Sequence, residues 1–404
     1  MTRYGLWILV GGALLAVLAG GYFWSIQSTG GLSEAETEAR MADAEEAFAR
    51  ADYAETAEIL AELSEAGYPL AQYRLGLMYR EGRGVDVDLD RSVALLEDAA
   101  SQGWSAAEQA LIGLYLRRAT MATTLEEGVP WYRRAADRDD AGAIAVLGSY
   151  YYSGTAVDRD VPRGLRMLTE AAEAGDVRAQ TNLGYAYATG SGVTRDDQRA
   201  FQWYLRAAEG GMVRAQAAVG LFYENGIGTD PNLQEAVRWY LNVVDEGAAG
   251  VGARLGALIA SGAISADTYP RADSWLLEAA QAGDAGAITY IQAQAEAGDV
   301  AALYALGTMY SSGEGVPQNA QRAIRYLQQA ATGGSPDAQF AMAQRLAAGD
   351  GIEQDYFQAH IWANLAASRG VDGAAQQRDV FARFLTPEQL AAAQNAATAW
   401  QPAE

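Results

Sequence analysis

The chain has 404 residues, a net charge of −22 and a single histidine, His360, and it contains neither cysteine nor lysine. Without cysteine, the sequence excludes disulfides, thiol catalysis, cysteine-ligated zinc and iron–sulfur clusters. Without lysine, it also excludes Schiff-base catalysis and a P-loop phosphate site. The strongly negative charge argues against nucleic acid as a partner, because phosphate binding needs clustered Arg or Lys.

Residues 5–24 form an uncharged apolar run, GLWILVGGALLAVLAGGYFW, and we predict a transmembrane anchor over residues 1–24. A helix of this length spans about 30 Å, the thickness of the hydrocarbon core of a bilayer. Arg3 precedes the run and the next basic residue is Arg40, so the N-terminus is expected in the cytoplasm. The rest would then lie outside the inner membrane, which in a bacterium is the periplasm. The alternative is a cleaved signal peptide and a secreted periplasmic protein.

Residues 25–32 are rich in Ser and Gly, which indicates a short flexible linker. Residues 33–70 predict a degenerate helical hairpin that caps the rest of the chain. We expect Phe48, Tyr53, Ile59 and Leu60 to face inward, among eleven acidic residues and two arginines. End units of repeat arrays differ from the middle in this way, because their outer face meets solvent.

From residue 71 the sequence repeats with a period of 36 residues. The pattern predicts six repeats over residues 71–286, one lone helix over 287–301, two further repeats over 302–373 and capping helices over 374–404. The repeats begin at Ala71, Ala107, Ala143, Ala179, Ala215, Val251, Ala302 and Ala338. Units this short cannot bury their own apolar face, so stacking predicts an all-α solenoid.

Each repeat is expected to form two helices, which we call helix A and helix B. Helix A carries Leu and usually Gly at the fourth and fifth positions after its start, then an aromatic residue three positions on, all on one helical face. A glycine inside a helix costs roughly 1 kcal/mol against alanine, so its recurrence predicts close approach of helix B. A Gly-x-Gly turn then ends helix A, and an Asp or Asn caps helix B. The predicted caps are Asp88, Asp160, Asp196, Asn232, Asn319 and Asp355, and an aromatic core stripe on helix B comprises Trp131, Trp203, Trp239, Trp275, Tyr326 and Trp362.

Two repeats depart from this pattern. The repeat at Ala107 lacks the Gly-x-Gly turn, and we expect its hairpin to turn around residues 123–127. The repeat at Val251 has Gly262 and then Pro270 in place of a regular turn. The lone helix after it is expected to change the pitch of the superhelix.

The pattern A-x-x-x-L-G-x-x-Y-x-x-G-x-G-V…D…A-x-x-W-Y-x-x-A-A-x-x-G resembles the Sel1-like repeat, a relative of the tetratricopeptide repeat, over about residues 35 to 375. The resemblance implies a right-handed α-solenoid in which helix A lines a concave groove. It also implies an adaptor that assembles membrane or envelope complexes. The properties of the cysteine-rich branch of the family, with its disulfide-braced hairpins, do not transfer to a chain without cysteine.

The sequence predicts a binding scaffold and not an enzyme. No nucleophile-elbow, zinc-protease or dinucleotide motif occurs, and no small-molecule cofactor is expected. His360 is expected at a surface or flank position of a helix B. Two Asp-x-Asp segments, at residues 86–88 and 158–160, lack the closing Glu of a calcium loop, so no metal site is predicted.

The outward positions of helix A predict a partner-binding face. They are Tyr73, Arg80, Glu81, Arg178, Tyr185, Arg214, Glu224, Asn225 and Tyr304. Arg178 and Arg214 lie one period apart and would form a basic ridge for an acidic or extended protein segment, because Arg and Tyr dominate the binding energy of interfaces. An equal alternative is that these arginines only pair with neighbouring acids. The other functions considered are a cell-wall enzyme or its regulator, and a structural spacer without a specific partner.

Overall fold

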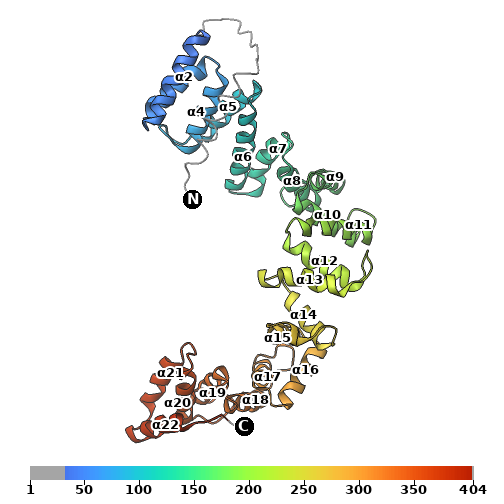
Figure 1. Cartoon of the computed structure of the whole chain (residues 1–404), viewed down its shortest axis with the longest axis vertical. Helices are drawn as coiled ribbons and strands as arrows, with labels where there is room; N and C mark the ends of the chain where they lie inside the picture. Colours follow the sequence, from blue (N-terminus) through green and yellow to red (C-terminus); the bar gives the residue numbers. More distant parts are fainter. Residues whose placement is uncertain (1–31, 403–404) are drawn as a thin grey trace. The chain divides into compact units, whose positions relative to one another are not determined.

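The computed structural model describes residues 32–402 (Figure 1), which form α-helices, short 3-10 helices and the turns that join them. The predicted anchor over residues 1–24 lies outside the described residues, as does the linker up to residue 31. Within the described range no helix is long and apolar enough to cross a bilayer. That range also contains no strand, which confirms the all-α prediction for it.

The chain divides into two compact units, Met1–Asp160 and Val161–Glu404. The helices of the first unit are α2 (Glu34–Ala49), α3 (Tyr53–Glu65), α4 (Pro69–Glu81), α5 (Leu89–Ser101), α6 (Ser105–Met121), α7 (Leu125–Ala136) and α8 (Ala141–Ser153). In this unit each helix packs mainly against the helices before and after it in the sequence, as in a solenoid.

The helices of the second unit also pack mainly against their sequence neighbours, except that the last helix packs against the helix before the preceding one. The first helices of this unit are α9 (Val161–Glu173), α10 (Val177–Thr189), α11 (Asp197–Glu209), α12 (Val213–Asn225), α13 (Leu233–Val243), η1 (Val244–Glu246), α14 (Val251–Ala260), η2 (Ala266–Thr268) and α15 (Ala272–Gln281). The remainder are α16 (Ala285–Glu296), α17 (Val300–Ser312), α18 (Ala320–Thr332), α19 (Pro336–Ala348), α20 (Tyr356–Ser368), α21 (Ala374–Phe381), η3 (Ala382–Phe384) and α22 (Pro387–Ala399). The right-handed sense of the array stays a prediction.

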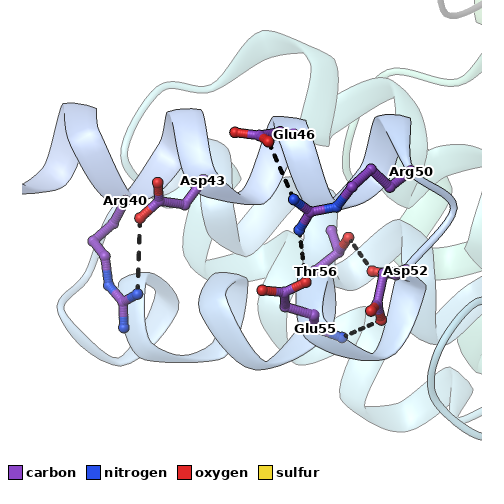
Figure 2. A network of polar contacts seen from close by, with 7 residues as sticks. All are labelled: Arg40, Asp43, Glu46, Arg50, Asp52, Glu55 and Thr56. Atoms are coloured by element: carbon purple, nitrogen blue, oxygen red, sulfur yellow. Dashed lines mark hydrogen bonds and ion pairs between the residues drawn. The ribbon is translucent and has the colours of Figure 1, made fainter.

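The N-terminal hairpin of α2 and α3 is closed by polar contacts at its turn (Figure 2). Arg50 pairs with Glu46 at 3.1 Å and with Glu55 at 2.9 Å, and so joins the two helices. Asp52 caps α3 by accepting a hydrogen bond from the backbone N–H of Glu55. Ile59 and Leu60 are buried as predicted, and the rings of Phe48 and Tyr53 meet edge to face at 5.2 Å.

The glycine inside helix A marks close contact with helix B, as predicted. An added Cβ at Gly220 of α12 would lie 2.5 Å from the ring of Tyr240, and one at Gly256 of α14 only 2.0 Å from the backbone oxygen of Trp275. Contacts of 3.0 Å or less are found in the same way at Gly76, Gly184 and Gly307. The cost of glycine in these helices is therefore offset by packing that no larger residue permits.

The predicted ends of the helices are largely confirmed. Glycine in the left-handed conformation ends α4, α8, α10, α12, α17 and α19, at Gly82, Gly154, Gly190, Gly226, Gly313 and Gly349. The side chains of Asp88, Asp196, Asn232, Asn319 and Asp355 accept backbone hydrogen bonds as N-caps of helix B. The second glycine of the turn packs against the preceding helix B, because a Cβ at Gly228 would lie 2.0 Å from the backbone oxygen of Asp197.

The aromatic stripe of helix B lies in the core only in part. Trp239 and Trp275 are buried. Trp131, Trp203, Tyr326 and Trp362 are half-buried. Arg206 lies 4.8 Å from the centre of the Trp203 ring, and Arg118 lies 4.1 Å from that of Trp131. Guanidinium groups thus cover part of the aromatic surface that the hairpins leave open.

Candidate partner-binding surface

Helices α10 and α12 are the A helices of two consecutive repeats, with α11 packed against both. Asp176 caps the N-terminus of α10, whereas Met212 at the same position of α12 offers no side-chain hydrogen bond. Both helices have thirteen residues and end at a left-handed glycine. Equivalent residues on them therefore occupy equivalent places, which allows the two to be compared position by position.

The two predicted ridge arginines, Arg178 and Arg214, occupy the second position of α10 and α12, and both are exposed. Arg178 approaches Asp176 at 3.5 Å, although that carboxylate already accepts the backbone hydrogen bonds of the helix start. Arg214 has no ion-pair partner among the described residues. The sequence has Leu70, Ala106, Gly142, Gly250, Ala301 and Asp337 at this position of the other repeats, so the ridge is confined to these two.

An exposed apolar side chain follows each arginine at seven residues, two helical turns along the same face. These side chains are Tyr185, which is 54% exposed, and Leu221, which is 42% exposed. The face therefore offers two cations and two apolar groups in matching rows, the combination found at interfaces that bind protein segments.

Tyr204 of α11 lies directly beneath this surface, only 8% exposed, and the sequence did not predict its place there. Its ring lies against Gly184 of α10, where an added Cβ would be 2.7 Å away. The pKa of Tyr204 is raised to about 12, mainly by burial and less by Tyr185, while Arg214 has an opposite, lowering effect. The Tyr204 hydroxyl thus interacts electrostatically with Tyr185 of α10 and with Arg214 of α12. The signal for it in the sequence is the Trp-Tyr pair of helix B, of which the predicted core stripe includes only the Trp.

Glu224, predicted as a partner-binding residue, is engaged within the chain. Its carboxylate accepts a hydrogen bond from the Tyr240 hydroxyl at 2.8 Å and forms a bidentate pair with Arg254, whose Nη2 and Nε lie 2.6 and 2.7 Å from the two carboxylate oxygens. Only 10% of its side chain is exposed. Burial and this hydrogen bond raise the pKa of Tyr240. Glu224 is therefore removed from the candidate surface. The neighbouring Asn225 donates to the backbone oxygen of Leu221, also within α12.

Comparison with known proteins identifies the repeats. The family model of the Sel1 repeat matches residues 69–104, 125–140, 141–176, 177–212, 213–242, 300–335 and 336–371, more than half of the chain. The chain belongs to the Sel1 repeat family. Six of the seven matched segments start two residues before a predicted frame, because helix A begins before the buried small residue that defined the frame. The segment 125–140 instead covers α7. No match falls on residues 105–124, which contain α6, or on residues 243–299, which contain the hairpin α14–α15 and α16.

Two solved structures illustrate the likeness. The protective antigen c5321 of uropathogenic Escherichia coli strains, which displays an SLR fold, is 26% identical, with 91% of this chain and 84% of that chain covered and a TM-score of 0.50. A Sel1 repeat protein from Oxalobacter formigenes is 27% identical, with 59% of this chain and 98% of that chain covered and a TM-score of 0.45. No curated protein matches the sequence.

The remaining predicted residues lie elsewhere in the Sel1 repeats. Tyr73 of α4 is half-buried beside the Trp104 ring, and Arg80 pairs with Glu81 at 2.9 Å, all within the first unit. Tyr304 of α17 is half-buried, and burial raises its pKa. These residues therefore do not add to the α10–α12 face, which keeps Arg178, Tyr185 and Arg214 from the prediction and gains Leu221 and Tyr204.

His360 corrects the prediction of a surface or flank position, because it is only 2% exposed within α20 of the last Sel1 repeat. Its Nδ1 has no hydrogen-bond partner among the described residues. Burial and the nearby Arg378 lower its pKa, against a smaller opposite effect of Asp379. A buried, neutral histidine in a helical core is a packing residue. The closing helices α21 and α22 pack against α20, and the sequence pattern of a single repeat does not reveal that contact.

Proposed function

We propose that the protein is a scaffold that binds an acidic, extended segment of a protein partner on the face of α10 and α12. The Sel1 repeat fold commonly mediates protein–protein interaction, and the family is generally not enzymatic. The observation that carries the proposal is the pair of exposed arginines, Arg178 and Arg214, each followed by an exposed apolar side chain. In a chain with a net charge of −22, such a local cationic face selects an acidic partner.

We further propose that the scaffold is tethered to the inner membrane and organises an envelope complex. The uncharged residues 5–24 and the placement of the basic residues support the tether and a periplasmic location of the repeats. Retention in the membrane fraction after carbonate extraction, with the repeats accessible to protease only from the periplasm, is the expected result. Release by carbonate would instead favour a cleaved, secreted form.

The binding proposal is tested by crosslinking in intact membranes followed by mass spectrometry. We expect the double variant Arg178→Glu and Arg214→Glu to lose the specifically crosslinked protein, because two cations become anions. The matched control changes Arg206 and Arg238, exposed arginines of α11 and α13, to Glu and should retain it. Equal recovery from all three proteins would refute the proposed face. Absence of any specific crosslinked protein would favour a structural spacer.

A further inference from the structure

Two neighbouring contacts between consecutive A helices share the same packing of a helix B tyrosine on a helix A glycine. They differ in the polar side chains around that tyrosine. In the junction of α12 and α14, the ring of Tyr240 lies on Gly220, and in the junction of α10 and α12 the ring of Tyr204 lies on Gly184. Tyr204 and Tyr240 are 36 residues apart, as are Gly184 and Gly220. We call the first the closed junction and the second the open junction.

The closed junction contains a complete carboxylate site. Glu224, one turn after Gly220, accepts a hydrogen bond from the Tyr240 hydroxyl and pairs with Nε and Nη2 of Arg254 in a bidentate contact. A bidentate Arg–carboxylate pair with an additional hydroxyl donor is among the stronger polar arrangements in proteins. The chain itself thus shows how a carboxylate is held between a tyrosine and an arginine in this repeat.

The open junction has no carboxylate of its own. The residues equivalent to Glu224 and Arg254 are Ala188 and Ala218, each 36 residues earlier. No described residue hydrogen-bonds to the Tyr204 hydroxyl, and none forms an ion pair with Arg214. Arg214 lies one helical turn before Ala218, the position equivalent to Arg254. Its side chain is long enough to bring a guanidinium group near the Tyr204 hydroxyl, where the closed junction has that of Arg254. The influence of both Tyr185 and Arg214 on the pKa of Tyr204 supports this proximity.

We infer that a glutamate side chain of the bound partner occupies the open junction, accepts a hydrogen bond from the Tyr204 hydroxyl and pairs with Arg214, as Glu224 does in the closed junction. This inference rests on the proposed function and names its central contact. Apolar residues beside that glutamate would contact Tyr185 and Leu221. The ligand is therefore a protein segment in which glutamate stands among apolar residues.

The test uses a variant in which the protein itself places a carboxylate in the open junction. Ala188→Glu supplies the carboxylate that the closed junction has, without removing any binding residue. The matched control, Ala188→Gln, has nearly the same size but no charge. The probe is a short, capped, fluorescein-labelled peptide of alternating Glu and Leu, and its counterpart has Gln in place of Glu. Fluorescence anisotropy with the full-length protein in detergent measures binding, and circular dichroism verifies that the variants fold.

We expect the wild type to bind the Glu peptide at least about tenfold more tightly than the Gln peptide, since charged hydrogen bonds and pairs are the stronger ones. Ala188→Glu should abolish this preference, and Ala188→Gln should keep it. Tyr204→Phe, which removes only the hydroxyl, should weaken binding of the Glu peptide by about tenfold. Binding of the Glu peptide to Ala188→Glu as tightly as to the wild type overturns the inference, as does equal affinity of the wild type for both peptides.

These results separate the inference from the proposed function. If the crosslinked partner is lost from the Arg178 and Arg214 double variant but retained by Ala188→Glu, the face binds a partner and the proposed glutamate contact is wrong. If no variant changes partner recovery, the proposed function itself is wrong. Self-association on this face, measured by sedimentation velocity and abolished by Ala188→Glu, would identify a second copy as the occupant and overturn a heterologous partner.

Discussion

The regular hairpins, α10–α11 and α12–α13, differ from the irregular hairpins, α6–α7 and α14–α15, in how glycine is used. In the regular hairpins, glycine ends helix A in the left-handed conformation and a second glycine packs on the preceding helix B. Helix α6 instead ends at Ala122 in an extended conformation, and α14 ends at Ser261 in a helical one. The family model matches the regular hairpins and omits most of the irregular ones.

The irregular hairpins show which of these glycines are needed for helix packing. In α14–α15 the turn is lost, but Gly256 still allows contact with the backbone of α15. In α6–α7 the glycine that allows the two helices to approach closely is on the second helix. A Cβ at Gly128 would lie 2.9 Å from the backbone oxygen of Ala119. Close approach of the two helices is therefore retained in every one of these hairpins, while the Gly-x-Gly turn is dispensable.

The largest expected effect comes from Gly228→Ala in the regular turn. Its Cβ would lie 2.0 Å from a backbone oxygen, and its φ is +65°, so we expect a loss of about 3 kcal/mol or more in local stability. Gly262→Ala in the irregular turn has the same strain at φ +75° but nothing within 4 Å, so about 1 kcal/mol is expected. Hydrogen exchange of the flanking helices measures both values. Equal losses would show that the turn glycine acts only through its backbone conformation.

The next effect concerns His360 in α19–α20, a hairpin with the regular turn. Its pKa is lowered in the folded protein, so between that pKa and its ordinary value near 6.5 the unfolded chain binds more protons. Stability therefore falls as the pH drops through and below about 6.5, by at most about 1.4 kcal/mol per pH unit for one proton. Thermal unfolding at several pH values should show this component in the wild type and not in His360→Leu. An identical pH dependence in both proteins would assign it to the carboxylates alone.

Whether the sequence could predict a contact depends on how far apart the contacting residues lie along the chain. The capping by Asn232 and the glycine end at Gly226 follow from a few neighbouring residues, and they were predicted. The engagement of Glu224 was not, because it needs Tyr240 from the next helix and Arg254 from the next repeat. His360 likewise lies near Arg378 and Asp379 of α21, a helix outside its own repeat. Contacts between repeats involve residues that change from repeat to repeat, and a consensus pattern averages these out.

A smaller effect is expected from Asn232→Ala at the start of α13. The Asn232 side chain accepts a hydrogen bond from the backbone N–H of Glu235, and loss of such a cap costs about 1 kcal/mol. Helix α15 has no side-chain cap at Arg271, so the comparison predicts faster exchange of first-turn amides there than in α13 of the wild type. Gln234→Ala, an exposed change two residues on, should leave the exchange of α13 unaltered. If α13 and α15 exchange alike before the mutation, the cap contributes nothing measurable.

The smallest effect, and the only stabilising one, is expected from Gly113→Ala in the irregular α6. An added Cβ at Gly113 meets no atom within 4 Å, so the glycine has no packing role. Alanine should then stabilise α6 by about 0.5–1 kcal/mol, because it loses less backbone entropy on folding. Gly220→Ala in the regular α12 should have the opposite sign, since its Cβ would lie 2.5 Å from the Tyr240 ring. Hydrogen exchange within α6 and α12 reports both changes. Destabilisation by both would contradict the absence of a packing role for Gly113.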